Sequence, residues 1–186
     1  MTRSRALLVP VLLLCALLGG CGGSGGSGDS SDAPADRPDD FAISFHHSDG
    51  SVAPPYHAEY TIEVDSDGSG RATYWPDYPG KGVPAYKSTF TLDDSELDDL
   101  YGEVRDAGLL TDIEESDDPP IGGSVETAEI TADGETYEVP GFAADGSSPA
   151  SAISGQMVGL VPTADWDSFQ KRREAYAKSE YGQAPQ

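Results

Sequence analysis

One short acidic segment has residue types and spacing that could hold a cation. Residues 65–70 read DSDGSG, so the oxygen-bearing side chains of Asp65, Asp67 and Ser69 alternate and a glycine follows. The calcium loop of helix–loop–helix proteins begins with this pattern. Pro76 occupies the place of its closing glutamate, and Asp and Gly are also common residues of plain hairpin turns. A plain turn and a weak cation site are therefore the two interpretations, and the turn is favoured.

A pair of glutamates is a second candidate for cation binding. In the segment VETAEITADGETYEVP, the Asp133-Gly134 pair predicts a two-residue hairpin turn. That turn sets a register in which Glu129 lies opposite Glu138 on the polar face. Like charges directly across a strand pair are destabilising. Either salt screens them, or a bound cation or basic partner offsets them.

The histidines and the known catalytic motifs give no positive indication of an enzyme. His46 and His47 are adjacent in a strand, so their side chains point to opposite faces and do not easily share a metal. His57 is separate from them, and no HExxH, GxSxG, phosphate-binding or dinucleotide-binding motif is present. We therefore expect no catalytic residue, no metal and no cofactor.

Aromatic residues are the strongest sequence indication of a binding surface. Tyr60 and Tyr74 are expected to face the core, whereas Trp75 has the opposite parity and precedes the irregular segment PDYPGKGVP. Tyr and Trp on a rigid edge are common binding anchors, so Trp75 and Tyr78 are candidate binding aromatics. The alternative is that a loop or the last helix covers Trp75, because large aromatics are usually buried.

A cysteine follows an apolar segment near the N-terminus. Arg3 and Arg5 precede an apolar run of 13 residues, from Ala6 to Leu18. A membrane-spanning helix needs about 20 apolar residues, so this run has the length of a signal-peptide core instead. Two small residues, Gly19 and Gly20, then lead into Cys21.

The order Leu18-Gly19-Gly20-Cys21 resembles the lipobox of bacterial lipoproteins. This resemblance implies that residues 1–20 are a signal peptide, and that Cys21 receives a diacylglyceryl thioether and becomes the mature N-terminus. Two or more acyl chains give durable membrane attachment. The resemblance thus implies a lipid bilayer as partner and a location in the cell envelope, facing outside the cytoplasm. The alternatives are a secreted protein with an unmodified cysteine and an uncleaved membrane helix.

The charge of the chain excludes one class of partner. The 33 acidic and 11 basic residues give a net charge of −22, and removing residues 1–20 with their two arginines makes it −24. A field of this sign disfavours nucleic acid and attracts cations or basic proteins. The partner is otherwise open: a protein or a small molecule, with cationic partners favoured by the charge.

Composition divides the chain into four parts. Residues 1–20 are the predicted signal peptide, and residues 21–40 comprise Cys21 and a Gly/Ser/Asp linker. The linker contains no large apolar residue, so we expect it to be disordered. Residues 41–182 are predicted to form one domain, followed by a disordered tail at 183–186.

Alternation of apolar and polar residues predicts strands at 41–45, 56–64, 71–75 and 86–92, and in the hairpin around Asp133-Gly134. Asp93 and Glu96 form a capping-box pattern at the start of a helix over 93–108, whose apolar stripe comprises Leu97, Leu100, Tyr101 and Val104. A short apolar stripe at 153–161 ends at Pro162, and Thr163 is expected to cap a final helix that carries Trp166, Phe169 and Tyr176. We therefore predict an α+β fold, mainly an antiparallel sheet of about six strands with two or three helices on one face.

The order FAISF, YTIEVDSDG, RATYW, STFTLDDSELDDLY, TADGETYEV resembles a loose group of small bacterial domains of unknown function with an open antiparallel sheet. Emfourin, a bacterial inhibitor of metalloproteases, has a similar layout. The resemblance implies no functional residue. Our interpretation is a membrane-anchored lipoprotein with a non-catalytic binding module. The alternatives are an inhibitor of a secreted protease and a hydrolase with an unrecognised site.

Overall fold

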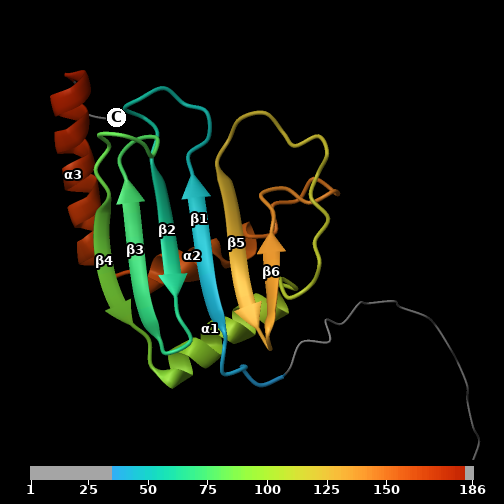
Figure 1. Ribbon diagram of the computed structural model, residues 1–186. Helices are drawn as coiled ribbons and strands as arrows, with labels where there is room; N and C mark the ends of the chain where they lie inside the picture. The colour runs from blue at the N-terminus through green and yellow to red at the C-terminus, as the bar shows by residue number, and fades with distance from the viewer. Residues whose placement is uncertain (1–34, 183–186) are drawn as a thin grey trace, which may run out of the picture. The chain divides into compact units, whose positions relative to one another are not determined.

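The computed structural model describes residues 35–182, which form a six-stranded antiparallel sheet with three helices on one face (Figure 1). The predicted α+β class is confirmed. In chain order the elements are β1 Ala42–Ser48, β2 Glu59–Val64, β3 Ser69–Trp75, β4 Tyr86–Thr91, α1 Asp94–Asp106, β5 Val125–Ala132, β6 Glu135–Val139, α2 Ser151–Leu160 and α3 Thr163–Tyr181. Cys21 and residues 183–186 lie outside the described residues.

The strand order across the sheet is β4-β3-β2-β1-β5-β6. Four pairs join strands that are consecutive in the sequence, namely β1–β2, β2–β3, β3–β4 and β5–β6. The pairing of β1 with β5 is instead long-range, and it places Phe45 beside both Ile62 and Ala128. The first strand is thus central, so both halves of the sheet depend on it.

The two faces of the sheet differ in polarity because side chains alternate along each strand. On the helix side, Ile43, Phe45, Ile62 and Ile130 are at most 3% exposed and form part of the core. The opposite face carries polar residues in matching register, namely Ser44, His46, Thr61, Glu63, Arg71, Thr73, Thr127, Glu129, Thr136 and Glu138.

Local turn and cap signals produce the predicted structures. Asp133 and Gly134 both have positive φ, at 54° and 77°, which a two-residue turn of this type requires. The hairpin then pairs Glu129 with Glu138 and Ile130 with Tyr137, as predicted. At α1, the Asp93 side chain accepts from the Glu96 amide at 3.0 Å, and Glu96 accepts from the Asp93 amide at 2.8 Å.

The domain extends beyond the predicted N-terminal boundary at Phe41. Arg37 Nε donates to Asp98 at 2.7 Å. The two carboxylate oxygens of Asp40 accept the backbone N–H groups of Asp133 and Gly134 at 2.8 and 2.7 Å. Arg37 and Asp40, whose segment has the composition of a linker, therefore hold α1 and the β5–β6 turn.

Two other expectations are wrong in detail. The second strand begins at Glu59 rather than at residue 56, because Tyr56 N–H donates to Ala53 in a turn that follows the loop after β1. Thr163 does not cap α3: it is the first helical residue, Pro162 occupies the cap position, and no side chain caps the helix. Among the described residues, no helix is both long and apolar enough to cross a membrane.

The capping box of α1 gives a stability prediction. Replacing Asp93 with Ala removes the acceptor for the Glu96 amide, so the free energy of unfolding should fall by about 1 kcal/mol. Asp99→Ala is the matched control, because Asp99 is an exposed carboxylate in the middle of the same helix. Urea denaturation of both variants measures the difference. Equal stabilities would contradict a role for the cap.

Candidate functional site

A pocket of about 230 Å³ lies between the helix side of the sheet and α3. Residues from β1, β2 and β3 form its floor, and residues from α2 and α3 form its other walls. Its lining comprises His47, Asp49, Ala58, Tyr60, Tyr74, Val158, Trp166, Gln170 and Arg173. Concave sites with apolar walls and a few polar groups are the usual form of small-molecule sites.

Helical spacing brings three α3 residues to this pocket. Trp166, Gln170 and Arg173 are four and three residues apart, so they lie on one face of the helix. Phe169 and Ala177 are at most 2% exposed and hold α3 against the domain. Helix α3 runs beside β4 at one edge of the sheet (Figure 1).

Aromatic rings form one wall of the pocket. The Trp166 ring meets Tyr60 edge-on at 5.1 Å and Tyr74 edge-on at 6.5 Å between ring centroids. Tyr74 also stacks on Phe169 at 5.5 Å. The Trp166 indole N–H donates to the Val158 carbonyl at 3.1 Å. The indole therefore presents an apolar surface to the pocket with its polar atom already paired.

Two carboxylates hold the His47 ring at the rim of the pocket. Its Nε2 lies 3.2 Å from Asp49 and its Nδ1 lies 3.1 Å from Glu126. Because both nitrogens face carboxylate oxygens, both must carry a proton for both hydrogen bonds to form. The hydrogen bond to Asp49 and that to Glu126 outweigh burial and raise the pKa of His47 above 6.5.

The same cluster shifts two further groups. Burial acts to raise the pKa of Asp49, but the hydrogen bond from His47 and the nearby Arg173 outweigh it and lower that pKa. Burial, with the negative charges of Glu126 and Asp49, raises the pKa of Tyr60 to about 12. Tyr60, whose ring stacks on His47 at 4.7 Å, is therefore a neutral phenol at physiological pH.

Two buried polar atoms of the pocket residues have no hydrogen-bond partner within the described part of the chain: the Tyr74 hydroxyl and Arg173 Nε. Tyr74 is 2% exposed. Arg173 and Gln170 approach the Tyr74 hydroxyl without the geometry of a hydrogen bond, and burial raises the pKa of Tyr74. Buried polar groups are nearly always paired, so these two donors mark the positions where a bound molecule or a water would form hydrogen bonds.

The other two histidines share Glu59, which has the parity of the sheet face opposite the pocket. Glu59 lies 2.8 Å from His57 Nε2 and 3.1 Å from His46 Nε2. The second nitrogen of His57, Nδ1, lies 2.9 Å from the Gly50 carbonyl. His46 and His47 lie on opposite faces of β1, as predicted. Within residues 35–182, no group of three or more His, Cys, Asp or Glu side chains is arranged to hold a metal.

The residues proposed for cation binding lie at two places. Asp65 and Asp67 lie in the β2–β3 turn and Ser69 begins β3. Asp67 accepts the Ser69 amide at 2.8 Å, and that hydrogen bond lowers the pKa of Asp67. Glu129 and Glu138 lie opposite each other in β5 and β6. Glu129 and Glu138 lie on the face of the sheet opposite the pocket, and the β2–β3 turn lies at the end of the strands away from it. Neither place contributes a residue to the pocket lining.

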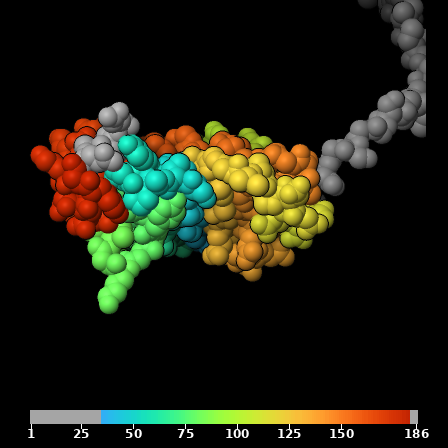
Figure 2. All heavy atoms as spheres, turned by 90° about the horizontal axis from the view of Figure 1, so that it is seen from above, coloured from blue at the N-terminus to red at the C-terminus, as the bar shows by residue number. Residues whose placement is uncertain are grey.

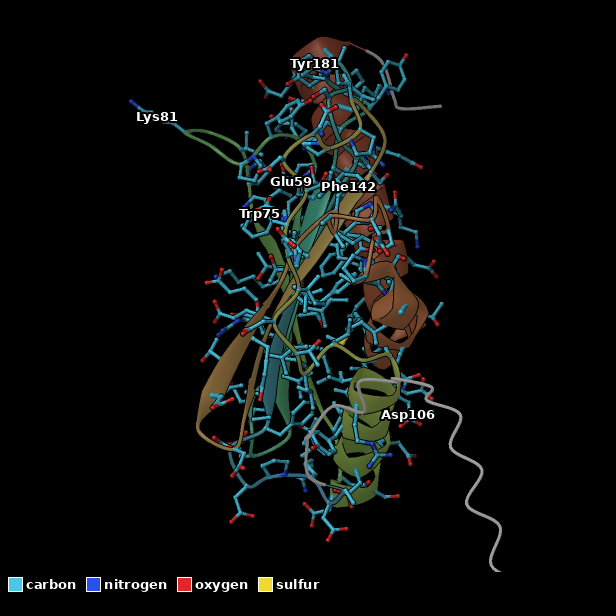
Figure 3. The ribbon with its side chains drawn as sticks, turned by 90° about the vertical axis from the view of Figure 1, so that its right-hand side faces the viewer. Glu59, Trp75, Lys81, Asp106, Phe142 and Tyr181 are labelled. Carbon is cyan, nitrogen blue, oxygen red and sulfur yellow. The ribbon has the colours of Figure 1, made fainter. Side chains whose placement is uncertain are left out.

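The candidate aromatics Trp75 and Tyr78 lie outside the pocket. Trp75 is half-buried at the end of β3, beside Glu59 in the neighbouring strand. Tyr78 stacks on His57 at 3.5 Å, and its hydroxyl donates to the Val52 carbonyl at 2.7 Å. Tyr78 thus fixes the base of loop 76–85, which projects from the domain with Lys81 at its tip (Figures 2 and 3).

Sequence reasoning missed Asp49, Gln170 and Arg173 and assigned Tyr60 and Tyr74 only to the core. For Arg173 a signal was available: it is seven residues after Trp166, so it lies on the same helix face as an expected core residue. No signal identified Glu126 as a partner of His47, because their contact depends on the long-range pairing of β1 with β5.

No model of a known protein family matches the chain, and no curated protein is significantly similar to it.

The His47 cluster predicts a pH dependence of stability. Because the folded-state pKa of His47 is raised, its contribution is complete below pH 6.5 and is lost as the pH rises through the folded-state pKa. The free energy of unfolding should therefore fall above pH 6.5, and His47→Gln should reduce this slope. Nuclear magnetic resonance (NMR) titration of the imidazole, with Asp49→Asn lowering its midpoint, measures the cause. A native midpoint at or below 6.5 would contradict the assignment.

Proposed function

We propose that this chain is a lipid-anchored protein of the cell envelope whose α+β domain binds a small molecule, without catalysis, in the pocket between the sheet and α3. One observation supports binding above all: the Tyr74 hydroxyl and Arg173 Nε are buried in the pocket region and have no hydrogen-bond partner among residues 35–182. A bound molecule that supplies those partners would remove the cost of leaving them unpaired.

The hydrogen bonding around the pocket supports binding rather than catalysis. Ser154 Oγ donates to Glu126 at 2.7 Å, and the same carboxylate oxygen also lies 3.1 Å from His47 Nδ1. Ser154 is not among the residues that line the pocket, so it is not placed to attack a molecule bound there. Both nitrogens of His47 face Asp49 and Glu126, which leaves neither free to transfer a proton to a ligand. A rigid, internally paired rim of this kind fits a site that holds its ligand unchanged.

The anchor rests on Cys21 and the segment around it. The apolar run before it and the order Leu18-Gly19-Gly20-Cys21 support acylation. Residues 22–34 are glycine, serine, aspartate, alanine and proline, a composition typical of a flexible spacer between a membrane and a domain. The net charge of −24 in the processed chain would keep the domain away from anionic lipid surfaces.

The anchor is tested by mass spectrometry of the protein purified from its native membranes. We expect a chain that begins at Cys21 and carries added acyl groups. Cys21→Ser should abolish both the processing and the membrane attachment, whereas Cys15→Ser should change neither, because Cys15 lies in the segment that is removed. A native chain that keeps Met1, or one that is cleaved without acylation, would contradict the anchor.

The pocket is tested by an NMR screen of small ring compounds of neutral, anionic and cationic types. Binders should perturb the resonances of Trp166 and Tyr60. Val158→Phe should abolish these perturbations, because a larger side chain at a half-buried lining position fills the space. Ala152→Phe, at an exposed position of the same helix, is the matched control and should bind as the native protein does. Perturbations that persist in Val158→Phe would place binding elsewhere.

A further inference from the structure

We propose that the ligand of this pocket is a small ring compound carrying a carboxylate, which accepts hydrogen bonds from Arg173 and Tyr74. This inference rests on the proposed function and specifies the chemical class of the ligand. It follows from which polar atoms of the pocket are already paired and which are not.

The two unpaired polar atoms, the Tyr74 hydroxyl and Arg173 Nε, can both donate a hydrogen bond to an acceptor. Arg173 Nε carries a hydrogen and has no lone pair to offer, so it can pair only with an acceptor. The Tyr74 hydroxyl can donate as well, and at 2% exposure solvent reaches it little. One carboxylate group has two oxygens and can accept from both.

The existing hydrogen bonds of the Arg173 guanidinium leave its Nε–H available to a ligand. One terminal nitrogen of Arg173 donates to the Tyr56 carbonyl at 2.8 Å, which fixes the orientation of the group. The closest ion pair is to Asp49 at 3.9 Å, too long for a hydrogen bond. The planar guanidinium is therefore held in place while its Nε–H is unpaired, and a carboxylate oxygen is a strong acceptor for a charged N–H donor of this kind.

The carboxylates at the rim are already committed. The oxygens of Asp49 and Glu126 lie against the two nitrogens of His47. With His47 protonated, these two acids are balanced by His47 and Arg173, so the pocket region carries no net negative charge that would exclude an anion. An amine in the same place would leave Arg173 Nε unpaired and add a like charge beside it.

The remaining walls select the body of the ligand. Tyr60, Tyr74 and Trp166 surround the pocket with ring faces and edges, and Ala58 and Val158 add aliphatic surface. Rings pack on such surfaces in offset or edge-on arrangements. The Gln170 side chain lines the pocket too and offers one further donor and acceptor.

The experiment compares three probes of matched size on the purified native protein by isothermal titration calorimetry: phenylacetate, phenylacetamide and phenethylamine. We expect phenylacetate to bind at least tenfold more tightly than the other two. Tyr74→Phe removes only the hydroxyl and Arg173→Lys removes Nε while keeping the charge. Each should weaken phenylacetate binding about tenfold, with phenylacetamide less affected. Lys171→Gln removes a nearby exposed charge and should leave binding unchanged.

The outcomes separate the two proposals. If the amide or the amine binds as tightly as phenylacetate, or if Lys171→Gln weakens binding as much as Arg173→Lys, the carboxylate inference is wrong and the binding function survives. If none of the probes binds, and Tyr74→Phe lowers the unfolding free energy, an ordered water rather than a ligand pairs the two atoms. That result would overturn both proposals.

Discussion

The packing of α3 on the edge half of the sheet is the interaction on which the pocket depends. Phe169 stacks on Tyr74, the Ser88 hydroxyl donates to Asp165 at 2.5 Å, and the Tyr86 hydroxyl donates to the Arg172 carbonyl at 3.3 Å. These contacts fix the helix over β3 and β4. Without them the sheet would present Tyr60 and Tyr74 to solvent, and the pocket would have no wall opposite the strands.

The same packing explains why Arg173 lies at the pocket and not in solvent. Lys171, Arg172 and Arg173 are consecutive, so each points about 100° further around the helix. Lys171 is exposed, Arg172 lies over the Tyr86 ring at 3.8 Å, and Arg173 faces the pocket. Burying the apolar face that contains Trp166 and Phe169 therefore carries Arg173 inward as well. Its charge is accommodated by the Tyr56 carbonyl at 2.8 Å and by Asp49 at 3.9 Å, and its unpaired Nε gives the pocket a polar end.

Much of the fold could be predicted from sequence, because local signals determine it. The Asp133-Gly134 turn set the β5–β6 register residue by residue, and Asp93 with Glu96 set the start of α1. The prediction failed at two positions where the residue type alone was misleading. Thr163 has the residue type of a cap, yet Pro162 takes that position. Asp40 has the composition of a linker residue, yet both its oxygens accept hydrogen bonds from a turn 93 and 94 residues away in the sequence.

The candidate site was harder to predict than the fold, because its members come from segments with no common motif. His47 and Glu126 meet through the β1–β5 pairing, and Arg173 arrives from a helix more than 120 residues after His47 in the chain. Overall charge was a poor guide as well. Exposed charges are screened beyond about 8 Å at physiological ionic strength, so the acidic surface does not determine what binds inside the pocket. Selection there depends on which hydrogen-bonding atoms are left unpaired, and those atoms are donors in a chain whose surface is dominated by acceptors.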